Sequence, residues 1–120
     1  MIHAMKEIEF CGSALDDLRE FNVAVRQRMG QQLFKIQQGL EPDDWKPMTS
    51  IGSGVKEVRV KDISGAYRTV YIAKLPEKIY VLHCFQKKSQ QTNQTDIEIA
   101  KARLTEILNQ SKTTKLRRVK

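Results

Sequence analysis

Three strand-like stretches follow one another so closely between residues 55 and 85 that they leave few possible topologies. They are VKEVRVK (55–61), AYRTVYIAK (66–74) and IYVLHCF (79–85), rich in β-branched and aromatic residues. Only short turns, Ile63-Ser64-Gly65 and Pro76-Glu77-Lys78, separate them. A parallel crossover needs about a dozen residues, so these connections force antiparallel neighbours. The sequence therefore predicts a three-strand meander.

Helical patterns and one more strand flank this meander. Residues 6–10 alternate and predict a short strand, and Ser13 is placed to begin a helix. Apolar residues then recur at helical spacing from Val25 to Leu40 and stop at Gly39 and Pro42, which predicts a second helix or a bent continuation of the first. A last helix is predicted from about residue 95 to 109, with Thr95 and Glu98 as a capping box.

The predicted fold class is α+β, with a small antiparallel sheet made of the meander plus the N-terminal strand. A helical hairpin covers one face, and a C-terminal helix follows. Residues 41–54 are predicted to be a loop in which Trp45 and Met48 contact the core, although a loop tryptophan can also be a ligand platform. Residues 1–110 are predicted to form one domain, and residues 111–120 a basic, disordered tail. Met5 precedes the first strand pattern and is an alternative start to Met1.

Positive charge points to an anionic partner. The chain has 21 Lys and Arg against 14 Asp and Glu, a formal charge of +7, which favours nucleic acid or an acidic protein segment. A solubilising tail on an ordinary domain is the simpler alternative. No apolar run reaches the ~20 residues of a membrane helix, and the N-terminus lacks a secretory h-region. Two cysteines without a Cys/His cluster predict a cytoplasmic protein with no metal or other cofactor.

The cations of the predicted strands are the candidate binding residues. Arg59 and Lys61 lie in the polar phase of their strand, whereas Lys74, Lys87 and Lys88 lie at or beyond strand ends. Arg68 sits in an apolar, aromatic strand. A guanidinium there must find an anion or reach water, because an unpaired buried charge costs several kcal/mol, on the order of 3 or more. The alternative to an external anion is an internal ion pair with Glu57 or Glu9.

The series VKEVRV, GAYRTVYIA and IYVLHCFQKKSQQT, followed by the helix DIEIAKARLTEIL, resembles the RelE/HigB superfamily of toxins from type II toxin–antitoxin systems, closest to the phage-derived HigB-like branch. The resemblance covers roughly residues 5–110. It implies an mRNA interferase, a hydrolase that cleaves mRNA on the ribosome without a metal and so inhibits translation. It also implies a cognate antitoxin, often a helix-turn-helix DNA-binding protein, and no membrane partner.

The resemblance further implies roles for individual residues. Arg68 would stabilise the phosphorane-like transition state, and Lys87 or Lys88 would neutralise charge or move a proton. Arg59, Lys61 and Lys74 would bind flanking phosphates, and Phe85 would offer a surface for stacking a base.

His83 shares its alternation phase with Ile79, Val81 and Phe85, which favours a core histidine over a catalytic one. Cys84 has the opposite phase, which argues against a Cys–His nucleophilic pair. Two alternatives to a nuclease remain: a non-catalytic RNA- or DNA-binding module, and an adaptor whose open basic sheet face binds an acidic peptide.

Overall fold

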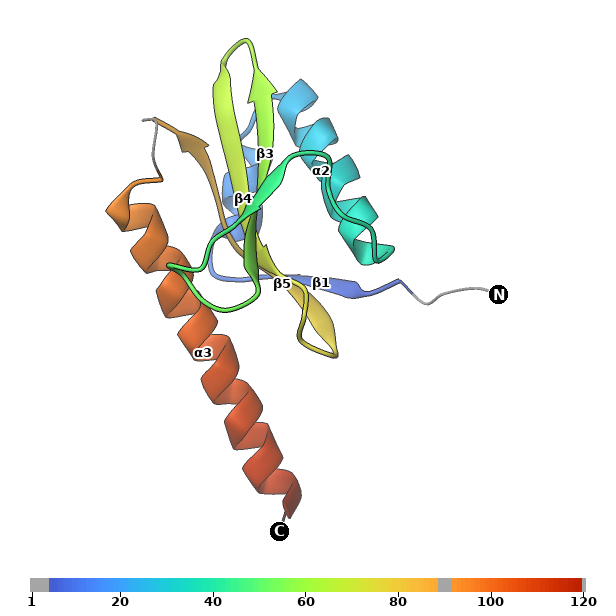
Figure 1. Ribbon diagram of the computed structural model, residues 1–120, viewed down its shortest axis with the longest axis vertical. Helices are drawn as coiled ribbons and strands as arrows, with labels where there is room; N and C mark the ends of the chain where they lie inside the picture. The colour runs from blue at the N-terminus through green and yellow to red at the C-terminus, as the bar shows by residue number, and fades with distance from the viewer. Residues whose placement is uncertain (1–4, 89–91, 120) are drawn as a thin grey trace.

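The computed structural model describes residues 5–88 and 92–119, with side chains described as far as residue 110. Five strands form one sheet in the order β1-β5-β4-β3-β2, and three helices pack against it (Figure 1). The elements are β1 (Glu7–Phe10), α1 (Ala14–Arg19), α2 (Val23–Gln37), β2 (Trp45–Pro47), β3 (Val55–Asp62), β4 (Gly65–Ile72), β5 (Lys78–Lys87) and α3 (Gln94–Val119). This confirms the predicted α+β class.

The meander is confirmed, since β3 pairs with β4 and β4 with β5, both antiparallel. The sheet is wider than expected at one edge. β2, which lies in the stretch predicted to be a loop, pairs antiparallel with β3 and places Trp45 opposite Val58. At the other edge β1 joins β5 in parallel, with Glu7 opposite Lys78. The sheet is therefore mostly, but not wholly, antiparallel.

One side of the sheet, called here the hairpin face, is covered by α1 and α2. Buried side chains of α2, such as Met29 and Leu33, pack there with Val58, Tyr71 and Val81 of the sheet. The side-chain oxygen of Asn22 accepts a hydrogen bond from the Val25 N–H and caps α2. Ser13 occupies the N-cap position of α1 as predicted, but its hydroxyl donates to Asp17 instead of accepting from the backbone. The predicted helical hairpin thus lies where the sequence placed it.

The opposite side, called here the α3 face, is covered only in part (Figure 1). Ala100, Leu104 and Ile107 of α3 pack with sheet residues that include Val70 and Leu82. The helix is capped by Asn93, whose side-chain oxygen accepts from the Asp96 N–H, and not by the predicted Thr95–Glu98 box. α3 continues through residues 111–119, where composition predicts a disordered tail.

A β-bulge changes the alternation of β5. Tyr71 of β4 lies opposite Val81, while the preceding Val70 lies opposite His83, so Leu82 is the extra residue. Ile79 and Val81 therefore pack on the hairpin face, whereas His83 faces α3. The prediction that His83 shares a face with Ile79 and Val81 was wrong for this reason. Its shared phase with Phe85 and opposition to Cys84 hold, because both lie beyond the bulge.

Candidate functional site

Cations from four strands gather on the part of the α3 face that α3 does not cover. Residues directly opposite one another in neighbouring strands point to the same face. Arg59 lies opposite Arg68, which in turn lies opposite Phe85. Lys87 follows Phe85 by two residues in β5 and therefore points to the same face. At the other edge of β3, Lys46 of β2 lies opposite Glu57, which precedes Arg59 by two residues. We call Lys46, Arg59, Arg68 and Lys87 the basic cluster.

Glu57 lies at the centre of the basic cluster and is fully buried. Its Oε1 lies 3.3 Å from Arg68 Nε and 4.0 Å from Arg59 Nε, and its Oε2 accepts a hydrogen bond of 2.9 Å from the Thr92 hydroxyl. The internal ion pair considered for Arg68 is therefore present, and its partner is Glu57. Glu9, the other candidate, contacts Lys78 instead.

Positive charge still exceeds negative charge in this region. Arg59 also approaches Asp44, whose Oδ1 lies 4.0 Å from a terminal guanidinium nitrogen. Among the described residues, only two carboxylates, those of Glu57 and the half-exposed Asp44, form ion pairs with members of the basic cluster, and they contact Arg59 and Arg68. Arg68 side-chain atoms are only 6% exposed, whereas those of Arg59 are 29% exposed. An incoming anion would therefore meet Arg59 more readily than Arg68.

Burial and mutual repulsion alter the acid–base behaviour of the cluster. Burial lowers the pKa of Arg68, Glu57 opposes this effect, and Arg59 adds to it. The pKa of Lys87 is also lowered, first by partial burial and then by Arg68, with smaller contributions from Lys46 and Arg59. An ammonium with a lowered pKa releases its proton more easily than an isolated lysine does. Lys87 is therefore the described lysine best suited to proton transfer at this site.

The remaining predicted site residues are less tightly associated with the cluster. Lys61 shares the strand phase of Arg59 and is exposed at the end of β3. Lys88 is exposed, and its ammonium contacts Gln86 Oε1 at 3.5 Å. Lys74 lies just after the C-terminal end of β4, and its ammonium donates to the Ser53 hydroxyl. The structure does not bring Lys74 together with Arg68.

Phe85 is 8% exposed, and its ring stacks on that of His83 with centroids 4.9 Å apart. Little of the ring is left to receive a base, so the stacking surface predicted for Phe85 is covered in this arrangement.

His83 forms the link between the sheet and α3. Its Nε2 lies 2.7 Å from Asp96 Oδ1, and both side chains are largely buried. Sequence reasoning did not single out Asp96 or Lys46, and it included Thr92 only as the last position of the motif that begins at Phe85. Lys46 was missed because it lies in the stretch predicted to be a loop. Asp96 and Thr92 lie just before or within the first turn of α3, and no local pattern shows which strand residue they meet. The signal available was a histidine in an apolar strand, which must have a polar partner when buried.

Among the described residues, no group of three or more His, Cys, Asp and Glu side chains is arranged to hold a metal ion. The described helices also include none whose length and apolar character would let it cross a bilayer.

Comparison with known protein families identifies the family of this chain. The family model of the phage-derived Gp49-like proteins (DUF891) matches residues 16–105. The chain belongs to this family. Gp49-like proteins are associated with toxins of toxin–antitoxin systems. The matched range runs from α1 into α3 and includes every residue of the basic cluster. No curated protein matches the Gp49-like chain significantly.

Proposed function

We propose that this Gp49-like protein is the toxin of a toxin–antitoxin pair and a metal-independent endoribonuclease that cuts mRNA on the ribosome. The observation that carries the proposal is the basic cluster, in which cations of β2, β3, β4 and β5 converge on one incompletely covered sheet face. The resemblance to RelE/HigB toxins, and membership of a toxin-associated family, supply the reaction class.

The reaction needs stabilisation of charge and a proton for the leaving group. Attack of a ribose 2′-hydroxyl on the adjacent phosphorus, with loss of the hydroxyl proton to solvent water, breaks the bond to the 5′-oxygen and leaves a cyclic phosphate and a 5′-hydroxyl. Negative charge rises on the phosphoryl oxygens as the bonds exchange. Arg68, held by Glu57, would donate to those oxygens, and Arg59, which is more exposed, would bind a flanking phosphate. Glu57 acts as a positioning residue for both guanidinium groups.

Lys87 would donate the proton to the departing 5′-oxygen. Partial burial and the neighbouring Arg68 already lower its pKa, which brings the ammonium closer to the value at which donation and recapture are both rapid near neutral pH. Lys88 does not share this environment, since it is exposed and contacts Gln86.

Translation in a purified system tests the proposal. Wild-type protein should stop synthesis and leave discrete cuts in ribosome-bound message, whereas Lys87→Ala should lower the cutting rate by about 100-fold, as expected for loss of a proton donor. Lys87 is partly exposed, so this variant keeps the fold. Lys101→Ala, on the exposed surface of α3, is the matched control and should cut like wild type. Equal cutting by wild type and Lys87→Ala would exclude Lys87 from the reaction.

Arg68 requires a conservative variant, because Arg68→Ala leaves the buried Glu57 without its partner and can unfold the chain. Arg68→Lys keeps the charge but loses the planar fork that matches a phosphate. We expect it to fold and to cut at least 10-fold more slowly. Wild-type rates in Arg68→Lys would assign Arg68 to structure alone.

A second function has one observation in its favour. Because Glu57 already neutralises Arg68, the cluster could bind RNA through its outer cations without cutting. Wild-type protein that binds RNA but leaves message intact on translating ribosomes would establish this binding function and exclude the nuclease. The proposed partners are mRNA on the ribosome and a cognate antitoxin, with a helix-turn-helix protein as the expected kind.

A further inference from the structure

The solvent side of α2 reverses the usual arrangement of charge on a surface helix. Such a helix normally carries its charges opposite the core. In α2 and its C-cap residue, the positions opposite the buried stripe are all uncharged, and all are exposed: Val23, Gln27, Gly30, Gln31, Phe34 and Gln38. We call this set the α2 stripe. The cations Arg26, Arg28 and Lys35 lie on its margins, and α2 contains no acidic residue. Carboxylates of neighbouring segments already contact two of them, since Arg28 lies 3.7 Å from Asp62 and Lys35 contacts Asp43. Arg26 donates to the Arg19 carbonyl oxygen and forms no ion pair among the described residues.

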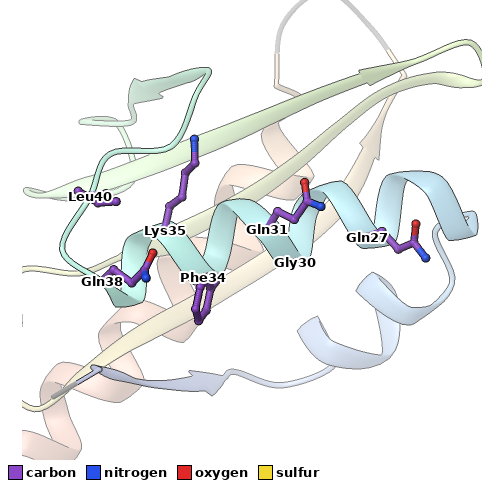
Figure 2. Close-up of a pocket in the computed structure, with 7 residues that line it drawn as sticks. All are labelled: Gln27, Gly30, Gln31, Phe34, Lys35, Gln38 and Leu40. Carbon is purple, nitrogen blue, oxygen red and sulfur yellow. The ribbon is translucent and has the colours of Figure 1, made fainter. Parts of the chain in front are cut away.

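The α2 stripe has an apolar hollow beside its centre. A depression of about 680 Å³ is bordered by Gln27, Gly30, Phe34, Lys35 and Leu40 (Figure 2). Phe34 is 48% exposed and Leu40 is 56% exposed. Figure 2 shows both near the C-terminal end of α2, with Gly30 one turn before Phe34. Large apolar side chains that meet no core residue are typical of a binding surface when they gather in one patch.

Gly30 is not explained by packing within the chain. It lies in the middle of a 15-residue helix, and a Cβ built there would meet nothing within 4 Å. Its backbone does not need a positive φ, which the structure assigns to other glycines. A helix-interior glycine without a local reason weakens the helix. Close approach of another backbone is the remaining physical use of a residue without a side chain.

We propose that the α2 stripe binds an amphipathic α-helix of a partner protein, with apolar or small residues along its centre and acidic residues on its margins. Gly30 and the hollow would accept the backbone and central side chains of that helix. Arg26 would pair with a carboxylate of that helix, while Arg28 and Lys35 already contact Asp62 and Asp43. The identity of this partner rests on the proposed function, under which it is the antitoxin.

Charge decides between this partner and a second copy of the chain. Two α2 stripes packed together would place Arg26, which has no carboxylate contact among the described residues, against another cationic margin in a chain that already carries +7. An acidic helix meets attraction at the same positions. The α2 stripe is also on the far side of the sheet from the basic cluster, because α2 covers the hairpin face. A partner bound there would leave the candidate nuclease site open.

The test uses the protein encoded next to this chain's reading frame as the antitoxin probe. Its affinity would be measured by titration calorimetry with the full-length chain and with three variants. Phe34→Asp should lower the affinity at least 30-fold, as for an interface hot spot. Gly30→Gln fills the hollow with the side chain that α2 already carries at Gln27 and Gln31. This variant should lower the affinity for the probe at least 10-fold. Arg26→Glu should lower it and reduce its dependence on salt.

Matched controls separate this surface from a general loss of fold. Ile63→Ala removes an apolar side chain that is fully exposed in the β3–β4 turn, and Lys101→Glu reverses a charge on α3. Both should bind the probe like wild type. Hydrogen exchange of the complex should show new protection across residues 23–38.

Several results would overturn the inference. They are failure of wild type to bind the probe, unchanged affinity in Phe34→Asp and Gly30→Gln, and sedimentation as a dimer that Phe34→Asp dissociates. Cutting of message by the free variants is measured separately. Variants that cut normally but bind the probe weakly support both proposals, whereas normal cutting with unchanged binding removes only the α2 assignment. Absence of cutting by wild type removes only the nuclease.

Discussion

At the scale of single residues, Glu57 has the most demanding environment in the described chain. It is a fully buried carboxylate that receives two guanidinium groups and one hydroxyl. Burying these charges costs desolvation energy, which their mutual attraction offsets only while each partner is present. The sequence made Glu57 one of two possible partners for Arg68, because both carboxylates lie on strands. The register of β3 against β4 decides between them.

Removal of the Glu57 charge is therefore expected to destabilise the fold. Glu57→Gln keeps the shape but leaves Arg68 buried without a counter-charge, and should lower the free energy of unfolding by about 3 kcal/mol. Urea titration followed by circular dichroism measures this. Glu77→Gln, at an exposed turn, is the control and should change stability by less than about 0.5 kcal/mol. A loss below about 1 kcal/mol for Glu57→Gln would mean that water reaches Arg68 freely.

The two thiols give a prediction about pH. Burial raises the pKa of Cys84 to about 12 and that of Cys11 to about 11, with Glu9 adding to the effect at Cys11. A raised pKa means less thiolate at any pH below it, so alkylation by iodoacetamide at pH 8 should be at least roughly tenfold slower in the folded chain than in urea. The rate should rise with pH until about 11, with Cys11 reacting first. Mass spectrometry that finds Cys84 alkylated as fast in the folded chain as in urea would contradict its burial.

At the scale of elements, α2 combines a well-packed inner side with an unexplained glycine. Gly30→Ala should raise the free energy of unfolding by about 0.8 kcal/mol, since the added methyl group meets open space and alanine favours helix. Gly39 is the matched control, because a Cβ there also meets nothing within 4 Å but its φ is +83°. Gly39→Ala should lower stability by about 1 kcal/mol through backbone strain. Thermal melts of both variants give the comparison, and equal shifts would contradict it.

Element types were predictable from the sequence where periodicity was long and connections short. The strands around Val60, Val70 and Val81 were found because connections this short permit only antiparallel pairing. β2 was missed because it has three residues and ends in Pro47, so it carries no period of its own. The bulge at Leu82 was missed because an inserted residue leaves the local composition unchanged. The face of the sheet on which His83 lies could therefore not be predicted from the sequence.

At the scale of the whole molecule, the basic cluster is a product of register. Arg59, Arg68 and Lys87 could be named from the sequence as cations of separate strands, and the pairings of β3, β4 and β5 place them together. Lys74 could have been separated from Lys87 by sequence, because antiparallel pairing places the end of β4 that Lys74 follows beside the start of β5. The closing of Thr92 onto Glu57 depends on how α3 docks, which no local pattern encodes.

Binding of RNA by such a surface should depend on salt. If about four phosphates are neutralised, a plot of log affinity against log salt concentration should have a slope near −3, from ~0.7 per phosphate for a single strand. Fluorescence anisotropy with a labelled single-stranded RNA measures it. Arg59→Gln should make the slope shallower by about 0.7, whereas Lys101→Gln should not change it. A slope near zero for wild type would remove the electrostatic basis of the nuclease proposal.

The parallel pairing of β1 with β5 sets an order of events in folding. Glu7 leaves the ribosome early in synthesis but cannot form its ladder until Lys78 has followed it. Such a distant closure is entropically costly and tends to come late. The emerging chain therefore lacks a completed sheet until β5 has been made, and the basic cluster, to which β5 contributes Lys87, is completed equally late. Pulse-labelled hydrogen exchange should find the β1 amides among the last to become protected, and early protection there would exclude this order.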